Sequence, residues 1–348
     1  MLYLTWIVGA DMKKIKIKFE TEKYVEDFLL RKFSEKYCFI ITDKPDYVIL
    51  SASSLYKCFQ YDCVRILILG ENIRPDFNLF DYACGFDEIE FGDRYLYYPL
   101  YCDIRFREET RLAMDKHIRG KKLLNIKNKF CNFMVSNGNN AAAIREEFFY
   151  ALNKYSTVDS AGTFLNNMPD HWTVPRGEDI DEIEEVNKFR EPYRFSFAFE
   201  NSRYLGYTTE KIIRAFSGVT IPIYWGDPGI KEKFNSKAFI DISDFESFDE
   251  AVNYIAKVNE NPELWQKMLL EPALPENSRI PEMIEDSYIL NFFGHIFEQS
   301  PEEALRRTNK DAGWGYHYEK QYEIGQKMQN DKLLNVVYRI KNKLKSLV

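Results

Sequence analysis

Apolar and polar positions divide the first hundred residues into short strands and a helical stretch. Residues 15–19 alternate apolar and basic side chains, as expected of a half-buried strand, and residues 22–37 read as helical. Residues 47–52 form a second strand, and residues 64–69 are apolar almost throughout, as is typical of a central parallel strand. This order of elements predicts an α/β fold.

The same alternation of strands and helices continues beyond residue 130. An apolar strand is predicted over residues 130–135 and a helix from Ala141 onwards. The pattern then gives strands at 195–199, 219–225 and 238–242, and helices over 247–258 and most of 262–299. A further helix lies between the first two of these strands: Thr208 or Thr209 is its expected N-cap, and Gly218 ends it. Strand, helix and strand here form one βαβ unit of a parallel sheet.

Polar residues cluster in the loop and first helical turn of this βαβ unit, namely Asn201, Tyr207, Glu210 and Lys211. In a parallel sheet, ligands bind at the carboxyl ends of the strands, where helix amino termini favour anions. A carboxylate there can accept hydrogen bonds from sugar hydroxyl groups, and a lysine can neutralise phosphate. The alternative is that Glu210 and Lys211 are ordinary surface residues of the first helical turn.

Two further residues occupy comparable positions. Glu71 follows the strand at 64–69, so its carboxylate is expected at the carboxyl end of that strand, although it could be a solvated loop residue. Arg145 lies early in the helix after residues 130–135, near its positive end, where it could reach a diphosphate; otherwise it is a surface arginine. The loop before it is neither a P-loop nor G-x-G-x-x-G, which argues against a kinase or a dehydrogenase.

Composition bounds the class of protein. A chain of 348 residues usually forms more than one domain. The net charge of −7 argues against a general nucleic-acid-binding protein. Six cysteines without a C-x-x-C pair indicate reduced thiols, and with no convincing secretory signal we expect a cytoplasmic protein. No apolar run approaches the roughly 20 residues of a membrane span.

No pattern of metal ligands is evident. The four histidines are scattered along the chain. Asp179 and Asp181 form a D-x-D pair, but they lie in an acidic run that leads into a predicted helix, where acidic residues suit the first turn. We therefore expect no metal site.

The last stretch, residues 333–348, is a basic amphipathic helix by pattern. Apolar residues recur at helical spacing, and the charged positions among them are basic. This segment is expected either to pack on the body of the protein or to lie on an anionic membrane, at roughly 1 kcal/mol per basic residue.

Three motifs carry a resemblance to a known family. FAFENS, YTTEK and IPIYWG, in this order between residues 197 and 226, resemble the donor-binding signature of the α-1,3/4-fucosyltransferases, although the family often has valine where Thr208 stands. The LGEN segment ending at Asn72 resembles the bacterial members. The resemblance implies a GT-B fold, in which two Rossmann-like domains face each other across a cleft, followed here by C-terminal helices.

The same resemblance implies roles for the candidate residues. Glu71 would be the general base, and Arg145 would contact the donor phosphates. Asn201, Tyr207, Glu210 and Lys211 would line the GDP-fucose site. Asp81 and Asp87 either shape the acceptor side or are needed only for the fold.

The function implied is inverting transfer of L-fucose from GDP-β-L-fucose to a hydroxyl group of N-acetylglucosamine in a lactosamine-type glycan, with no cofactor and with divalent ions at most stimulatory. An acceptor domain would span about 12–125, a donor domain 126–300, and a helical segment 301–348. The alternatives are a catalytically silent protein that binds glycans or nucleotides on the same fold, and a transferase for another nucleotide sugar.

Overall fold

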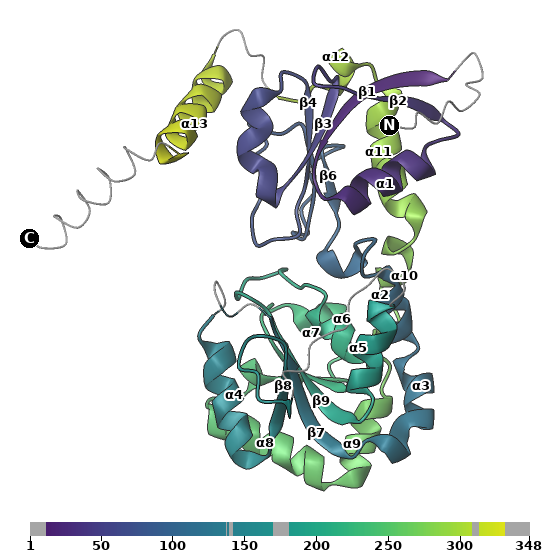
Figure 1. Ribbon diagram of the computed structural model, residues 1–348, viewed down its shortest axis with the longest axis vertical. Helices are drawn as coiled ribbons and strands as arrows, with labels where there is room; N and C mark the ends of the chain where they lie inside the picture. The colour runs from purple at the N-terminus through teal and green to yellow at the C-terminus, as the bar shows by residue number, and fades with distance from the viewer. Residues whose placement is uncertain (1–11, 137, 139–141, 170–180, 308–312, 331–348) are drawn as a thin grey trace, which may run out of the picture. The chain divides into compact units, whose positions relative to one another are not determined.

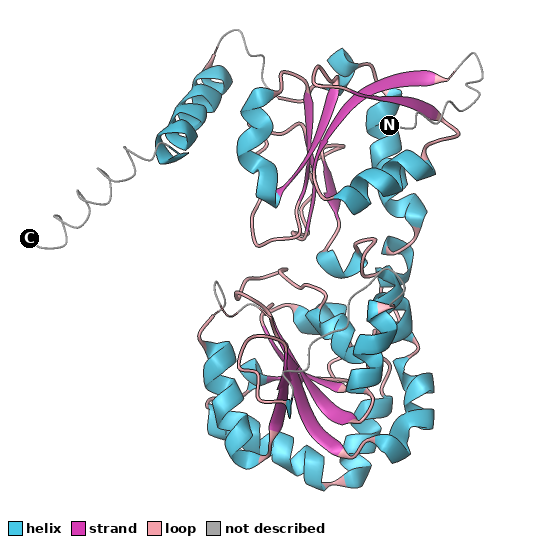
Figure 2. Ribbon diagram, viewed as in Figure 1, coloured by secondary structure: helices cyan, strands magenta, loops and turns pink. Residues whose placement is uncertain are grey.

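The computed structural model describes residues 12–136, 138, 142–169, 181–307 and 313–330. Its contacts divide the chain into two compact units. Unit 1 contains the described residues up to Gly85, then Ile89–Leu96, and those from Ile289 onwards; unit 2 contains Phe86–Glu88 and Tyr97–Tyr288. Each unit is a sheet with helices on its faces, which confirms the predicted α/β class (Figures 1 and 2).

Unit 1 is built on a six-stranded sheet in the order β2-β1-β3-β4-β5-β6. The strands are β1 (Lys13–Glu20), β2 (Tyr37–Ile41), β3 (Tyr47–Ser51), β4 (Val64–Ile68), β5 (Tyr82–Gly85) and β6 (Tyr95–Tyr97). Strands β2, β1, β3, β4 and β5 pair in parallel with their neighbours. Every residue of β3 and β4 is buried, as the continuous apolar run of β4 predicts.

Helices from both ends of the chain cover the sheet of unit 1. They are α1 (Lys23–Lys32), α11 (Asp286–Glu298, which begins in unit 2), α12 (Pro301–Ala304) and α13 (Trp314–Asn330). Phe297 of α11 packs edge-on against the rings of Phe33, Tyr37 and Tyr47, at centroid distances of 5.9, 5.9 and 5.5 Å. A residue near the end of the chain therefore completes the core formed by the first strands.

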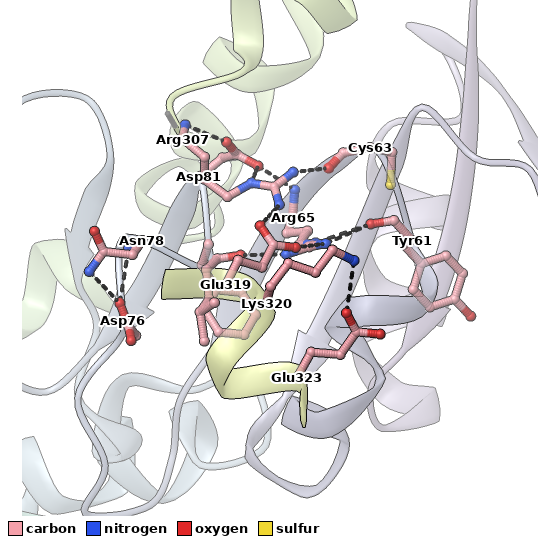
Figure 3. Close-up of polar contacts among 12 residues, drawn as sticks. Tyr61, Cys63, Arg65, Asp76, Asn78, Asp81, Arg307, Glu319, Lys320 and Glu323 are labelled. Carbon is pink, nitrogen blue, oxygen red and sulfur yellow. Dashed lines mark hydrogen bonds and ion pairs between the residues drawn. The ribbon is translucent and has the colours of Figure 1, made fainter. Parts of the chain in front are cut away.

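A buried ion network in unit 1 explains the one charged residue of β4 (Figure 3). Arg65 is 2% exposed; it donates to the Tyr61 carbonyl and, over 2.8 Å, to Glu319 of α13. Asp81 is fully buried and accepts from Arg307 Nε over 2.9 Å and from the Arg65 backbone N–H over 2.8 Å. Asp81 is thus bound within the fold of unit 1, which is the second of the two roles considered for it.

Unit 2 is built on a five-stranded parallel sheet in the order β11-β10-β9-β7-β8. The strands are β7 (Lys129–Met134), β8 (Val158–Ala161), β9 (Tyr193–Phe199), β10 (Ile221–Trp225) and β11 (Ile240–Asp241). The strand order reverses between β7 and β9, and such a switch point is where open α/β sheets bind ligands.

The helices of unit 2 are α2 (Arg107–Met114), α3 (Lys116–Leu123), α4 (Ile144–Tyr155), α5 (Glu182–Arg190), α6 (Lys211–Ser217), α7 (Ile230–Lys233), α8 (Phe248–Glu260), α9 (Pro262–Leu270) and α10 (Ile280–Met283). The core joins apolar side chains of the sheet, such as Phe133 and Phe195, to Phe148 of α4 and Ile255 of α8. Strands β9 and β10 pair in parallel with α6 between them, so the predicted βαβ unit is confirmed.

The structure differs from the sequence analysis in several details. Residues 97–125 group with unit 2 and residues 289–300 with unit 1, whereas the expected domain bounds were 12–125 and 126–300. Strand β2 was not predicted, and the predicted helix over 22–37 ends at Lys32. Residues 333–348 lie outside the described part of the chain. No described helix is long and apolar enough to cross a membrane.

Candidate active site

A cavity of about 590 Å³ opens in unit 2 at the switch point of its sheet. Its walls come from the carboxyl end of β7 and the following residues, from the end of β9, and from helices α2, α4, α5 and α6. Four of the predicted site residues line it: Arg145, Asn201, Glu210 and Lys211. They lie far apart in sequence, and the crossovers between β7 and β9 bring them together.

Arg145 and Asn201 form one polar side of this cavity. Arg145 is the second residue of α4 and is 2% exposed. Its Nη2 atom donates to the Phe199 carbonyl over 2.7 Å and to Asn201 Oδ1 over 2.9 Å, while its buried Nε atom has no hydrogen-bond partner. Burial lowers the pKa of Arg145, so an anion in the cavity would offset the cost of desolvating this guanidinium.

Lys211 and its acidic neighbours form the start of α6. The Lys211 ammonium donates to Thr209 Oγ1 over 2.8 Å and lies 3.5 Å from carboxylate oxygens of both Glu200 and Glu210. Burial lowers the pKa of Lys211, but the two carboxylates raise it by more, so that the pKa lies above its usual value. Lys211 and Arg214 hold the pKa of Glu210 near 2, against the effect of burial. Lys211 is therefore a cation and Glu210 an anion at neutral pH.

The threonines before α6 do not cap it as predicted. The helix begins at Lys211 with Glu210 at the N-cap position, and no side-chain cap bond is present there. Thr209 instead donates its backbone N–H and its hydroxyl to the fully buried Glu200, over 2.8 and 2.6 Å. Thr208 donates its hydroxyl to Asp227 over 2.8 Å. The N-cap prediction was wrong because two buried carboxylates compete for these hydroxyl groups.

Asp227 also fixes the loop that carries the predicted residues. It accepts from the backbone N–H of Gly206 over 2.7 Å and from Lys233 over 2.9 Å. Gly206 has φ +86°, which favours glycine. Tyr207 is 2% exposed, packs its ring against Phe86 at 5.2 Å, and does not line the cavity.

Sequence reasoning missed five charged residues of the cavity. They are Arg105 just before α2, Glu109 of α2, Glu182 and Arg190 of α5, and Arg214 of α6. Arg214 Nε donates to Glu109 Oε1 over 2.9 Å. Glu109 and Arg190 lie in charged helical stretches whose pattern resembles that of solvated surface helices, so no local signal marked them.

Glu71 belongs to unit 1. It follows β4 in an exposed turn in which the Glu71 carbonyl accepts from the Ile73 N–H over 2.7 Å. This places the carboxylate beyond the carboxyl end of a central parallel strand, as expected from the sequence.

One residue of the acidic D-x-D pair, Asp181, caps a helix. Asp181 is the N-cap of α5 and accepts from the backbone N–H groups of Ile183 and Glu184 over 3.0 and 3.1 Å. Asp179 lies outside the described residues. Within the described part of the chain, no group of three or more His, Cys, Asp or Glu side chains is placed to hold a metal ion. The six cysteines, all within the described residues, form no disulfide.

Comparison with known families gives two matches along the chain. Residues 17–103 match the model of the alpha-(1,3)-fucosyltransferase FucT N-terminal domain. Residues 124–269 match the model of the glycosyltransferase family 10 (fucosyltransferase) C-terminal part. The two matched segments together cover more than half of the chain.

Individual proteins give the same result. Alpha-(1,3)-fucosyltransferase FucT of Helicobacter pylori is 36% identical over 277 residues, which are 70% of this chain and 55% of that protein. A putative fucosyltransferase of Acanthamoeba polyphaga mimivirus is 27% identical and is covered over 50% of its length. The chain thus spans about half the length of these curated relatives.

Solved structures match over nearly their whole length. A crystal structure of an alpha1,3-fucosyltransferase with GDP has a TM-score of 0.66 and 29% identity, over 87% of this chain and 95% of that one. A second, with GDP-fucose, has a TM-score of 0.64 and 27% identity, over 88% and 96%.

Proposed function

Since this chain belongs to the fucosyltransferases of glycosyltransferase family 10 and has their GT-B fold, we propose that it transfers L-fucose from GDP-β-L-fucose to a sugar hydroxyl group. The observation that carries this proposal is the unit 2 cavity, in which Arg145 and Lys211 supply two cations at the switch point of a parallel sheet. The acceptor we propose is the 3-hydroxyl group of N-acetylglucosamine in a lactosamine-type glycan.

The diphosphate of the donor would lie against Arg145 and Lys211. When the bond to fucose breaks, GDP leaves with negative charge, and fixed cations stabilise that charge in the transition state. Glu210 is ionised beside Lys211 and so can accept hydrogen bonds from ribose or fucose hydroxyl groups. Asn201 would orient donor oxygen atoms. Tyr207, buried behind the cavity lining, would support the loop from behind.

Inversion at the anomeric carbon requires one direct displacement. Glu71 would accept the proton of the acceptor hydroxyl as its oxygen attacks, on the face opposite to the departing GDP. Its exposed position after β4 in unit 1 suits a base that must meet a solvent-borne acceptor.

The experiment that tests the function is a donor panel followed by product analysis. The purified chain is first titrated with GDP-fucose, GDP-mannose and UDP-galactose, and then incubated with N-acetyllactosamine and each of these donors in turn. We expect binding of the GDP sugars and a fucosylated trisaccharide with an α linkage. Binding without any product would favour a silent binding protein, and transfer from GDP-mannose alone would assign a different donor.

The site we propose works without a metal, because Arg145 and Lys211 supply the cationic charge. Transfer activity should persist in EDTA, with at most modest stimulation by divalent ions. Complete loss in EDTA with recovery in manganese would contradict this and direct attention to Asp179 and Asp181.

We further propose that the basic segment 333–348 contacts anionic membranes peripherally. The support is its sequence pattern, with basic side chains beside an apolar stripe. A chain that ends before Lys332 should keep activity on soluble acceptors and lose sedimentation with vesicles containing phosphatidylglycerol. If the full chain ignores such vesicles and the truncated chain melts at lower temperature, the segment packs on the protein instead.

A further inference from the structure

One end of the unit 2 cavity carries hydrogen-bonding groups that the protein itself leaves unused. Arg190 is 6% exposed, yet its Nε and Nη1 atoms have no hydrogen-bond partner among the described residues. Within the described part of the chain its side chain makes one hydrogen bond, from Nη2 to the sulfur of Met134 over 3.8 Å, and this bond is weak. Glu109, 2% exposed, likewise has one oxygen, Oε2, without a partner. Both residues line the cavity.

The packing of Arg190 shows that its position is built into the fold. A Cβ atom placed on Gly218 would lie 2.7 Å from Arg190 Cβ and 2.6 Å from Arg190 Cδ. Gly218 has φ −77°, which any residue adopts, so the glycine is required for space and not for backbone conformation. The stem of Arg190 therefore fits against the end of α6.

Unsatisfied buried donors and acceptors of this kind cost free energy unless a ligand pairs with them. The cost is larger for a charged group than for a neutral one. Burial lowers the pKa of Arg190 to about 10, which leaves it cationic at neutral pH, and burial raises the pKa of Glu109. The matching ligand must offer an acceptor to Arg190 and a donor to Glu109.

A second diphosphate contact does not fit this end of the cavity, because Glu109 would repel it. The cavity lining also contains apolar side chains, among them Phe133, Phe197 and Val186. A neutral, planar group with apolar faces and a mixed polar edge fits both features. Guanine is such a group: O6 and N7 accept hydrogen bonds, characteristically from arginine, while N1–H and the N2 amino group donate.

Building on the proposed function, we propose that Arg190 and Glu109 form the nucleobase subsite of this chain and select guanine over other bases. Arg190 donates to guanine O6 and N7, and Glu109 accepts from N1–H and N2. Arg214 holds the other oxygen of Glu109 and lies 4.0 Å from Glu210, which joins the base subsite to the residue proposed to hold the ribose.

The test compares nucleotides that differ only in the base. Calorimetric affinities are measured for GDP, IDP, ADP and inorganic pyrophosphate on the wild type, Arg190→Leu, Arg190→Lys and Glu109→Gln. Arg194→Leu is the matched control, because Arg194 is a part-buried arginine of the same unit that lines no part of this cavity. The melting temperature of each variant is recorded on the same preparation.

The wild type should bind GDP more tightly than ADP. Arg190→Leu and Arg190→Lys should each weaken GDP about 10–100-fold, the range for one specific base contact, while pyrophosphate binding stays within twofold. Glu109→Gln should reduce the preference for GDP over IDP, since IDP lacks the N2 amino group. The control variant Arg194→Leu should keep the wild-type ratios among the affinities for GDP, IDP, ADP and pyrophosphate.

Two different failures are distinguishable. If the wild type binds GDP but both Arg190 variants keep the wild-type ratio of GDP to ADP affinity, the base subsite is refuted and the proposed function stands. If the wild type binds no GDP, the proposed function fails, and this subsite fails with it. If Arg190→Leu is unfolded by its melting profile, Arg190→Lys alone decides, because it keeps the buried stem and the charge.

Discussion

The ammonium group of Lys116 lies 5.1 Å from the centre of the Phe216 ring, in a position fully closed to solvent. It donates to the carbonyl groups of Met268 and Glu271, over 3.4 and 3.2 Å, at the end of α9. Lys127 is similarly buried beneath the end of α6, 3.5 Å from the Gly218 carbonyl. No carboxylate forms a described ion pair with either lysine.

Stability should therefore rise with pH just above neutrality. Burial lowers the pKa of both Lys116 and Lys127 to about 7, whereas an unfolded lysine keeps its proton to about 10.4. Between these values the unfolded state binds more protons, so the free energy of unfolding increases with pH, by at most about 1.4 kcal/mol per pH unit for each lysine. Above pH ~8.5, ionisation of the cysteine thiols in the unfolded state opposes this gain.

Urea denaturation at intervals from pH 7.0 to 8.5 measures this slope. Lys116→Met removes the titrating group and keeps an unbranched apolar stem, so it should remove about half of the slope. A flat or falling profile for the wild type would show that these lysines keep their protons in the folded state.

Glu200 is predicted to hold Lys211, the lysine proposed to bind phosphate, in place. Glu200→Ala removes the acceptor of both Thr209 bonds and a buried partner of Lys211, and should lower the free energy of unfolding by about 3–5 kcal/mol. Thr209→Val keeps the backbone bond to Glu200 but removes the hydroxyl, and with it the bond to Glu200 and the bond from Lys211; it should cost about 1–3 kcal/mol. The double variant should cost less than the sum of the two, because both changes break the same bond. If the losses in unfolding free energy of the two single variants add up to the loss in the double variant, Glu200 and Thr209 do not stabilise the fold through a shared bond.

Arg145→Ala and Lys211→Ala should each weaken GDP and GDP-fucose alike, because both ligands carry the diphosphate. The loss of one charge-assisted hydrogen bond corresponds to about 1.5–3 kcal/mol, or roughly 10–150-fold in affinity. Lys231→Ala provides the control, since Lys231 is a partly exposed lysine of unit 2 that pairs with Asp244 outside the cavity. GDP affinity within twofold of wild type in both site variants would remove them from the donor site.

Glu71→Gln separates a catalytic base from a surface glutamate. Glutamine keeps the size of the side chain but cannot take up a proton at neutral pH. We expect donor affinity and melting temperature near wild type, with turnover lower by about 10²–10⁴-fold. Glu90→Gln, an exposed glutamate of the same unit, should change none of these. A Glu71→Gln enzyme that turns over within tenfold of wild type would need another base, such as Asp87.

The strands of both sheets could be predicted largely from sequence, and the reasons are local. The runs that became β4 and β9 are apolar over the length of a strand, and Gly218 marked the end of α6. Strand β2 escaped prediction because it is an edge strand whose Ile40 and Ile41 are exposed, so it lacks the pattern of burial that marks the others.

The site could be predicted only where its residues adjoin a recognisable motif. Asn201, Glu210 and Lys211 fall within the βαβ segment, and Arg145 lies in the first turn of α4, the helix that follows β7. Glu109 and Arg190 meet only because α2 and α5 flank the same cavity, and no local pattern encodes that meeting. The same holds for Glu200, whose partner Thr209 looked like a helix cap.

The interleaving of the two units along the chain has a consequence for biosynthesis. Strands β1 to β4 leave the ribosome first, but Phe297, which packs on Phe33, Tyr37 and Tyr47, is translated only after all of unit 2. Unit 2 is nearly continuous in sequence and can complete its core while the nascent chain is still growing. Until Phe297 is translated, the aromatic side chains of unit 1 that it covers, Phe33, Tyr37 and Tyr47, lack this packing partner. We therefore expect the core of this sheet, and not that of unit 2, to be completed last during synthesis.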